Sequence, residues 1–363
     1  MKYIDEFRNA KLVKKISQRI FAVTPNQNIN IMEVCGTHTQ NFYRFGLDKL
    51  LPRNIKFISG PGCPVCVSPQ DYIDNAIKLA QSKDTIIVTF GDMLRIPGSS
   101  SSLEKEKAKS GNLRVAYSPL DALTIAKSNR HKRVIFLAVG FETTAPTIAL
   151  SILAAKNENI KNLTFLSSLK LIPPALTYLL LDKRLKLDGF LLPGHVSAII
   201  GTKGYEFIPK RYKISCCVAG FEPLDILEGI CIIIEQIINN KSYVANQYAR
   251  IVNKPGNLKA QSIIKEVFKV SDSGWRGFGI IPGSGLKVRK DFSQFDASRF
   301  LPAGKAANSL KFSERCKCAD VLKGLILPLS CPLFAKRCNP DNPVGPCMVS
   351  SEGACNAYYK FRR

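Results

Sequence analysis

Short runs of apolar residues alternate along the chain with longer amphipathic stretches. The runs at 29–34, 56–59, 85–90 and 133–139 have the length and composition of buried strands. The amphipathic stretches between them, such as 3–23 and 119–130, predict helices. Strands that alternate with helices indicate an α/β architecture with largely parallel sheets.

The pattern contains two such series, followed by a different C-terminal part. Further strands are expected at 113–117, 164–168, 190–192 and 214–218, and further helices from about 145, at 174–181 and at 195–201. From residue 222 the pattern becomes helical, at 222–239, 243–252 and 258–268, and after Gly274 it is rich in Gly and Pro and irregular. We therefore expect two doubly wound lobes, 1–112 and 113–240, and a C-terminal part, 241–363, with a helical linker and a small loop-rich domain.

The net charge, the lengths of the apolar runs and the N-terminal residues limit the kinds of protein that this chain can be. Lys and Arg outnumber Asp and Glu by 52 to 28, which gives a net charge of +24. The basic residues are dispersed in short groups, so a solvated lysine-rich surface explains them better than a nucleic-acid site, and an acidic protein partner is a further alternative. No apolar run has the length of a membrane span, and the charged N-terminus lacks a signal-peptide core. A cytoplasmic location, where thiols stay reduced, is expected.

Half of the 12 cysteines lie near the C-terminus, at Cys316, Cys318, Cys331, Cys338, Cys347 and Cys355. Thiolates select iron–sulfur clusters, zinc or copper(I). The gaps are long and proline-rich, without paired Cys-x-x-Cys spacings, so an iron–sulfur cluster is the first interpretation and structural zinc the second. The four-thiolate set is Cys318, Cys331, Cys338 and Cys355, which leaves Cys347 and one of Cys316 or Cys318 spare. Buried apolar cysteines and disulfides are the alternatives, disfavoured by the density of cysteines and by the compartment.

Two further cysteine motifs follow predicted strands. Cys35 and His38, in CGTHTQ, come directly after the strand at 29–34, where a helix N-terminus should lower the pKa of the thiol and make it a nucleophile or metal ligand. A buried Cys beside a structural His is an equally good explanation. Cys63 and Cys66, in GPGCPVCV, have the spacing of a redox dithiol or of half a zinc site, and the first is favoured because no second Cys-x-x-Cys is present. Ser68 and Pro69 should begin the next helix as N-cap and first residue.

Other candidate residues carry a weaker signal. Glu142, Thr143 and Thr144 start a helix in GFETTAP, where Thr144 as N-cap explains much of the pattern. His195, in PGHVS, lies at a strand-to-helix turn, where a lone His is more often structural. Cys216, Cys217 and Cys231 have apolar surroundings typical of the core. P-loop, GxGxxG, HExxH and GxSxG patterns are absent from the sequence, so nucleotide hydrolysis and common hydrolase chemistry have no support.

Taken together, these motifs resemble one family, the HypD hydrogenase maturation proteins of [NiFe] hydrogenases. The matching stretches occur in family order from about residue 32 to the C-terminus. They are MEVCGTHT, SGPGCPVCV, GFETTAPT, LPGHVSAIIG, GFEPLDIL, NQYARIV, the GWRG…IPGSGL segment and the tail with PVGPCMVSSEGAC.

The resemblance implies two α/β lobes around a cleft and a C-terminal [4Fe-4S] domain. It implies a scaffold on which the Fe(CN)2CO unit is assembled together with the chaperone HypC, with cyanide delivered through HypF and HypE. By motif match, Cys35 would hold the iron with support from His38, and Cys63 and Cys66 would be a redox dithiol. The set Cys318, Cys331, Cys338 and Cys355 would hold the cluster that feeds electrons to it. Glu142, Thr143, Thr144 and His195 would line the cleft.

One residue departs from the family pattern, and two other functions remain open. Gln40 replaces the second His of the usual CGxHTH motif, although Gln also donates and accepts hydrogen bonds. A freestanding iron–sulfur thiol–disulfide reductase is the alternative function, in which Cys35 is dispensable. A basic nucleic-acid binder stabilised by zinc is the third.

Overall fold

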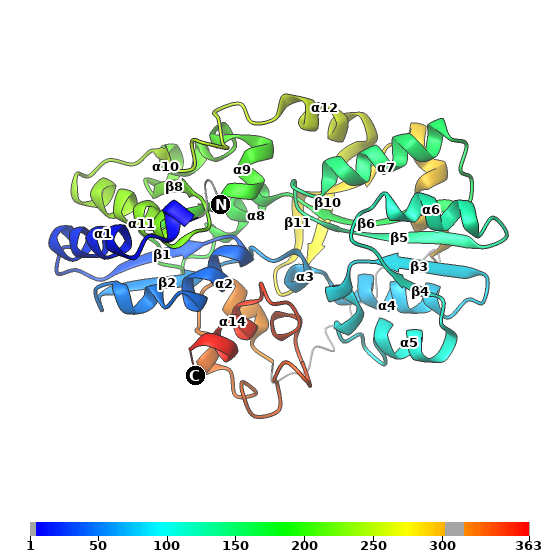
Figure 1. Cartoon of the computed structure of the whole chain (residues 1–363), viewed down its shortest axis with the longest axis horizontal. Helices are drawn as coiled ribbons and strands as arrows, with labels where there is room; N and C mark the ends of the chain where they lie inside the picture. Colours follow the sequence, from blue (N-terminus) through cyan, green and yellow to red (C-terminus); the bar gives the residue numbers. More distant parts are fainter. Residues whose placement is uncertain (1–4, 302–315, 363) are drawn as a thin grey trace.

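The first lobe is built on a parallel sheet whose strands come from two distant parts of the chain (Figure 1). The computed structural model describes residues 5–301 and 316–362. The sheet order is β2-β1-β7-β8-β9, and each neighbouring pair is parallel. The strands are β1 (Ile29–Glu33), β2 (Ile55–Ser59), β7 (Gly189–Pro193), β8 (Ser215–Ala219) and β9 (Val244–Asn246). The helices of this lobe are α1 (Ala10–Val23), α2 (Gly36–Arg44), α8 (Ile172–Leu179), α9 (Gly194–Ile200), α10 (Phe207–Tyr212) and α11 (Pro223–Ile238).

The second lobe contains a mixed sheet in the order β10-β11-β6-β5-β3-β4. Its parallel part consists of β3 (Thr85–Thr89), β4 (Leu113–Val115), β5 (Arg133–Gly140) and β6 (Leu163–Lys170). The antiparallel hairpin of β10 (Phe268–Trp275) and β11 (Gly279–Val288) extends it beyond β6. The helices are α4 (Gln70–Ala80), α5 (Leu103–Ser110), α6 (Asp121–Ser128), α7 (Ala145–Asn157) and α12 (Leu258–Val267). The central strand β5 is buried after its first residue, as parallel strands covered on both faces are.

The α/β architecture is confirmed, but the lobes share the chain differently from the division expected at residue 112. The chain leaves the first sheet after β2, forms β3 to β6 of the second, and returns through α8 to add β7 to β9. It then crosses again through α12 to form the hairpin. Sheet membership depends on pairing between distant strands, which the local pattern of apolar residues does not contain.

Three local predictions were wrong. Residues 243–252, expected as a helix, contain β9 and a turn, and the Gly-rich stretch after Gly274 forms β11. Helix α4 has Pro69 as its N-cap residue, while the hydroxyl of Ser68 donates to the carbonyl oxygen of Pro64 instead. The glycines at 277, 279 and 283 have positive φ angles, which suit the tight turn and irregular edge of a hairpin.

The third part of the protein, residues 316–362, is called the cysteine module here. It consists of short helices and turns, with α13 (Cys318–Leu322) and α14 (Ala354–Phe361) as its longest helices. It lies beneath both lobes in Figure 1, where α14 is close to α2 and the turn at Pro346–Met348 packs on α3 (Pro64–Val67). Within the described residues, no helix is long and apolar enough to cross a membrane.

Candidate functional site

Cys35 lies where β1 ends and α2 begins. It is the N-cap residue of α2, and its side chain is 8% exposed. Its main-chain N–H donates to the carboxyl of Glu33 over 2.8 Å, and the hydroxyl of Thr39 donates to the other oxygen of the same carboxyl. A buried carboxyl therefore fixes the turn that carries Cys35.

The Cys35 thiol is protonated in the free protein, contrary to the lowered pKa expected from the helix N-terminus. Burial raises the pKa of Cys35 to about 12, and the carboxyls of Glu352 and Glu33 add to the rise. The N–H groups of Thr37 and His38 favour the thiolate but do not outweigh burial. A metal ion that binds the sulfur would displace the proton, so such a site is better suited to a ligand than to a free nucleophile.

The CPVC motif packs directly against the Cys35 turn. Cys63 is the N-cap residue of α3, and its sulfur accepts the N–H of Cys66 over 3.2 Å. The N–H of Gly36 donates to the carbonyl oxygen of Gly62 over 3.0 Å. A Cβ atom on Gly62 would lie 2.2 Å from the nitrogen of Cys35, so only glycine permits this approach. The structure thus brings the first two predicted motifs together.

The cysteine module meets the same turn from the other side. A Cβ atom on Gly36 would lie 2.4 Å from the Cβ of Glu352, and the hydroxyl of Thr37 donates to the Glu352 carboxyl over 2.8 Å. The hydroxyls of Tyr43 in α2 and Tyr358 in α14 form a buried hydrogen bond of 2.7 Å. Helix α2, which begins at Cys35, is therefore tied to the module at both ends.

Cys347 connects the CPVC motif with the cysteines of the module. Its thiol lies near those of Cys66, Cys318 and Cys355, which all affect its pKa, and the sulfur of Cys316 lies 3.4 Å from that of Cys318. Sequence reasoning set Cys347 aside as spare. The spacing of Cys347 from the other cysteines in the sequence does not predict these contacts, because the neighbouring thiols come from three separate segments.

The module fits an iron–sulfur cluster in the chemistry of its donors. Five of its six cysteines are buried, and the exception, Cys316, is partly buried. The sulfur of Cys338 accepts the N–H of Val344 over 3.4 Å, the type of hydrogen bond that tunes cluster thiolates. Among the described residues, no group of three or more His, Cys, Asp or Glu side chains already has the arrangement of a metal site. The ligand set Cys318, Cys331, Cys338 and Cys355 remains a prediction.

His38 joins α2 to the turn that follows β8. Its Nε2 lies 2.8 Å from the carbonyl oxygen of Gly220, and its ring packs on Phe221, which in turn stacks on His195. Burial lowers the pKa of His38 to about 4, so the ring is neutral. These contacts make His38 a residue that positions the start of α2.

Glu142 is buried rather than open to solvent. One of its oxygens accepts the N–H of Ile172 at the start of α8 over 2.9 Å, which links the second lobe to the segment returning to the first. Burial raises the pKa of Glu142 to about 7. Burial raises the pKa of Tyr205, and the neighbouring Glu142 and Cys35 side chains add to the rise, so the three side chains lie near one another. Thr144 is the N-cap residue of α7, as expected, but its side chain makes no capping hydrogen bond.

Arg276 is a further buried residue that the sequence analysis missed. It lies at the turn of the β10–β11 hairpin, and its Nε donates to the carbonyl oxygen of Ser68, just beyond α3, over 2.7 Å. The next residue, Gly277, packs on Ala319 in α13, so the hairpin turn contacts both the end of α3 and α13. The sequence feature that could have pointed to Arg276 is its position in GWRG, a Gly-rich segment that contains the single Trp.

Comparison with known proteins identifies the family. A family described as "HypD: Hydrogenase formation hypA family" matches residues 10–362. The chain belongs to the HypD family. It is 43% identical to the hydrogenase maturation factor HypD of Escherichia coli, over 100% of this chain and 99% of that protein. It is 42% identical to the factors of the same name from Azotobacter vinelandii and Cupriavidus necator, over 100% of this chain and 97% and 98% of those proteins. Hydrogenase maturation is therefore the process in which this HypD-family chain takes part.

Proposed function

We propose that this protein is the scaffold on which the Fe(CN)2CO unit of [NiFe] hydrogenases is assembled together with HypC, with cyanide received from HypE and HypF acting upstream. Membership of the HypD family supports this assignment. Cys35 holds the iron, which is the cargo of the reaction. His38 orients the turn that carries Cys35.

The observation that carries the proposal is the meeting of three cysteine motifs at one turn. Gly62 of the CPVC loop contacts the main chain of Cys35, and Glu352 of the cysteine module contacts Gly36 and Thr37. A soft thiolate suits iron that carries cyanide and carbon monoxide, and a nearby dithiol can keep such iron reduced.

Cys63 and Cys66 form the redox dithiol in this proposal. The thiol of Cys66 reaches the module, because it donates to the carbonyl oxygen of Pro346 over 3.9 Å and lies near the thiol of Cys347. Cys318, Cys331, Cys338 and Cys355 would hold the [4Fe-4S] cluster, which supplies or accepts single electrons when bound.

Complementation tests the role of Cys35. Cys35→Ser should abolish hydrogenase activity in a strain lacking its own HypD, and should remove the infrared bands of iron-bound cyanide and carbon monoxide from the HypC complex. The matched control is Cys217→Ser, since Cys217 is also buried but belongs to the core of β8. Full maturation with Cys35→Ser would exclude the iron-holding role.

A freestanding iron–sulfur thiol–disulfide reductase is the second candidate, and the contact between Cys66 and Cys347 favours it. The two functions differ in their need for Cys35. Turnover of a disulfide substrate that requires Cys63 and Cys66 but survives Cys35→Ser would support the reductase.

A further inference from the structure

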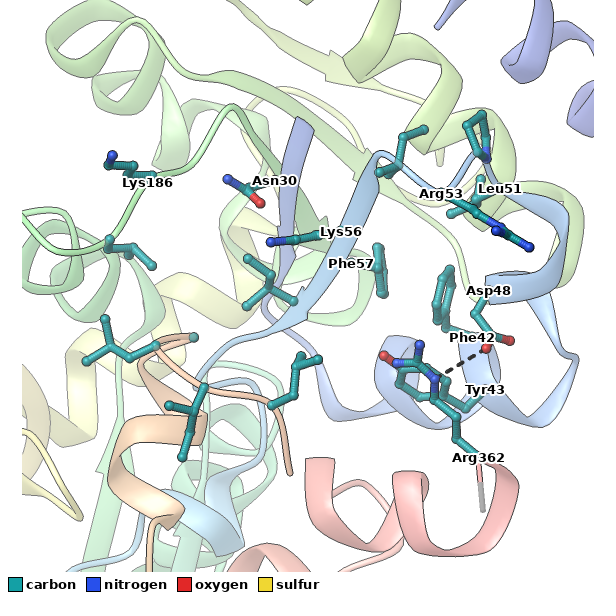
Figure 2. Close-up of a pocket in the computed structure, with 18 of the residues that line it drawn as sticks. Asn30, Phe42, Tyr43, Asp48, Leu51, Arg53, Lys56, Phe57, Lys186 and Arg362 are labelled. Carbon is teal, nitrogen blue, oxygen red and sulfur yellow. Dashed lines mark ion pairs between the residues drawn. The ribbon is translucent and has the colours of Figure 1, made fainter. Parts of the chain in front are cut away.

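A groove runs along the free edge of β2, on the side of the first lobe that faces the cysteine module (Figure 2). Its volume is about 660 Å³. Four consecutive residues of β2, Ile55 to Ile58, line it. Successive side chains of a strand point to opposite faces, so a cavity that touches all four lies against the edge of the strand.

Main-chain groups of β2 face this groove. Within the described residues, β2 is the outer strand of its sheet. The N–H of Ile29 donates to the carbonyl oxygen of Asn54, and the N–H of Gly60 donates to that of Glu33. With Ile29 opposite Ile55, this parallel register turns the main-chain groups of Lys56 and Ile58 toward β1. The N–H and C=O groups of Phe57 therefore point away from β1, where they are free to pair with an added strand.

Positive charge surrounds this edge. Arg53, Lys56 and Lys186 line the groove with exposed side chains, and no ion pair joins them to an acidic residue of the described chain. The only carboxylate among the lining residues is Asp48, which is paired with Arg362 over 3.5 Å. Figure 2 shows Lys56 and Lys186 on one side of the strand and Arg53 on the other.

Apolar side chains form the walls between these charges. Phe42 and Phe57, which stack with ring centres 3.9 Å apart, line the groove, and so do Leu325 to Leu327 of the cysteine module. Leu327 is 41% exposed. A groove with an open strand edge, apolar walls and a basic rim matches an extended segment that alternates acidic and apolar residues.

We infer that this groove binds an acidic, extended segment of a partner protein, which pairs with β2 as an added strand. The inference goes beyond the proposed function, because neither iron nor the thiols enter it. It also gives part of the +24 charge a role. The charge of Lys56 could instead protect the strand edge against aggregation. The experiment below distinguishes this role from partner binding.

The test uses a fluorescent peptide that alternates Glu and Val, with a Lys–Val peptide as its counterpart, and follows binding to the full-length protein by anisotropy. Arg53→Glu combined with Lys56→Glu should weaken binding of the acidic peptide by about tenfold or more, because two attractive contacts become repulsive. Lys83→Glu is the matched control, an exposed lysine in the other lobe. It should change the affinity less than about twofold, in line with weak long-range effects at physiological salt.

Two further readouts test strand pairing itself. The amide of Phe57 should exchange more slowly with deuterium in the complex, and methylating alternate main-chain nitrogens of the peptide should weaken binding by about tenfold. No binding by the acidic peptide overturns the inference and favours the protective role of Lys56. Three other results would also overturn the inference. One is that Lys83→Glu weakens binding of the acidic peptide as much as the double variant does, and another is that the methylated peptide binds as tightly as the unmethylated one. The third is that inorganic phosphate alone competes with the acidic peptide.

Discussion

The substitution Gly62→Ala tests the contact that unites the Cys35 turn with the CPVC loop. An added Cβ would lie 2.2 Å from the nitrogen of Cys35, 2.3 Å from the carbonyl carbon of Val34 and 2.4 Å from the Cα of Cys35. All three are main-chain atoms, so no side-chain rotation can relieve the overlap. The loop must move away from β1, which also strains the hydrogen bond from Gly36 to the carbonyl oxygen of Gly62.

The cost follows from these two effects. Overpacking a well-packed site costs about 1–3 kcal/mol. Loss of one buried hydrogen bond adds about 0.5–1.5 kcal/mol. Together they lower the free energy of unfolding by roughly 1.5–4.5 kcal/mol, a change of roughly 10-fold to 2,000-fold in the folding equilibrium.

Urea unfolding followed by the fluorescence of Trp275 measures this change, because the protein has a single Trp and it is buried. Gly91→Ala is the control, since its Cβ would find its nearest atom, on Val115, at 3.8 Å. It should change stability by less than about 1 kcal/mol. If Gly62→Ala is as stable as Gly91→Ala and still supports hydrogenase maturation, the close approach described here is not required.

Three further predictions concern other parts of the protein. Asp225→Ala should cost about 3–5 kcal/mol, because Arg250 makes two bonds to this fully buried carboxylate, whereas Glu235→Ala, which removes an exposed pair with Arg19, should cost at most about 1 kcal/mol by the same urea assay. The buried Glu142, with its pKa raised from 4.5 to about 7, keeps its proton in the folded state after the unfolded chain has lost it. Stability should therefore fall as pH rises from about 4.5 to 7, by up to about 3 kcal/mol, and Glu142→Gln should remove this component of the pH dependence. A pH profile identical to wild type would contradict the burial argument. Anaerobically purified protein should contain about four iron and four sulfide per chain; Cys338→Ser should lose them and Cys347→Ser should retain them, and the reverse result would reassign the ligands.

The local pattern of residues determined most of the elements and the place of each motif. Strands at 29–33, 55–59, 85–89 and 133–140 and helices such as α7 and α11 follow from apolar periods and from Pro in the first turn. Because functional groups gather after parallel strands, the position of Cys35 at a helix N-terminus was also predictable. The short helix α3 that begins after Cys63 was not predicted, since the next helix was expected to start at Ser68.

Tertiary structure decided how these pieces combine. The lobes interleave because β1 pairs with β7, more than a hundred residues away, and not with β3. Cys347 contacts Cys66 and Cys318 for the same kind of reason, since three segments distant in sequence pack together. The protonated state of Cys35 depends on burial and on Glu352, which the chain reaches only at its far end. Chemistry that depends on a residue's type can be inferred from sequence, whereas its pKa and its partners depend on solvent exclusion and on contacts between distant parts of the chain.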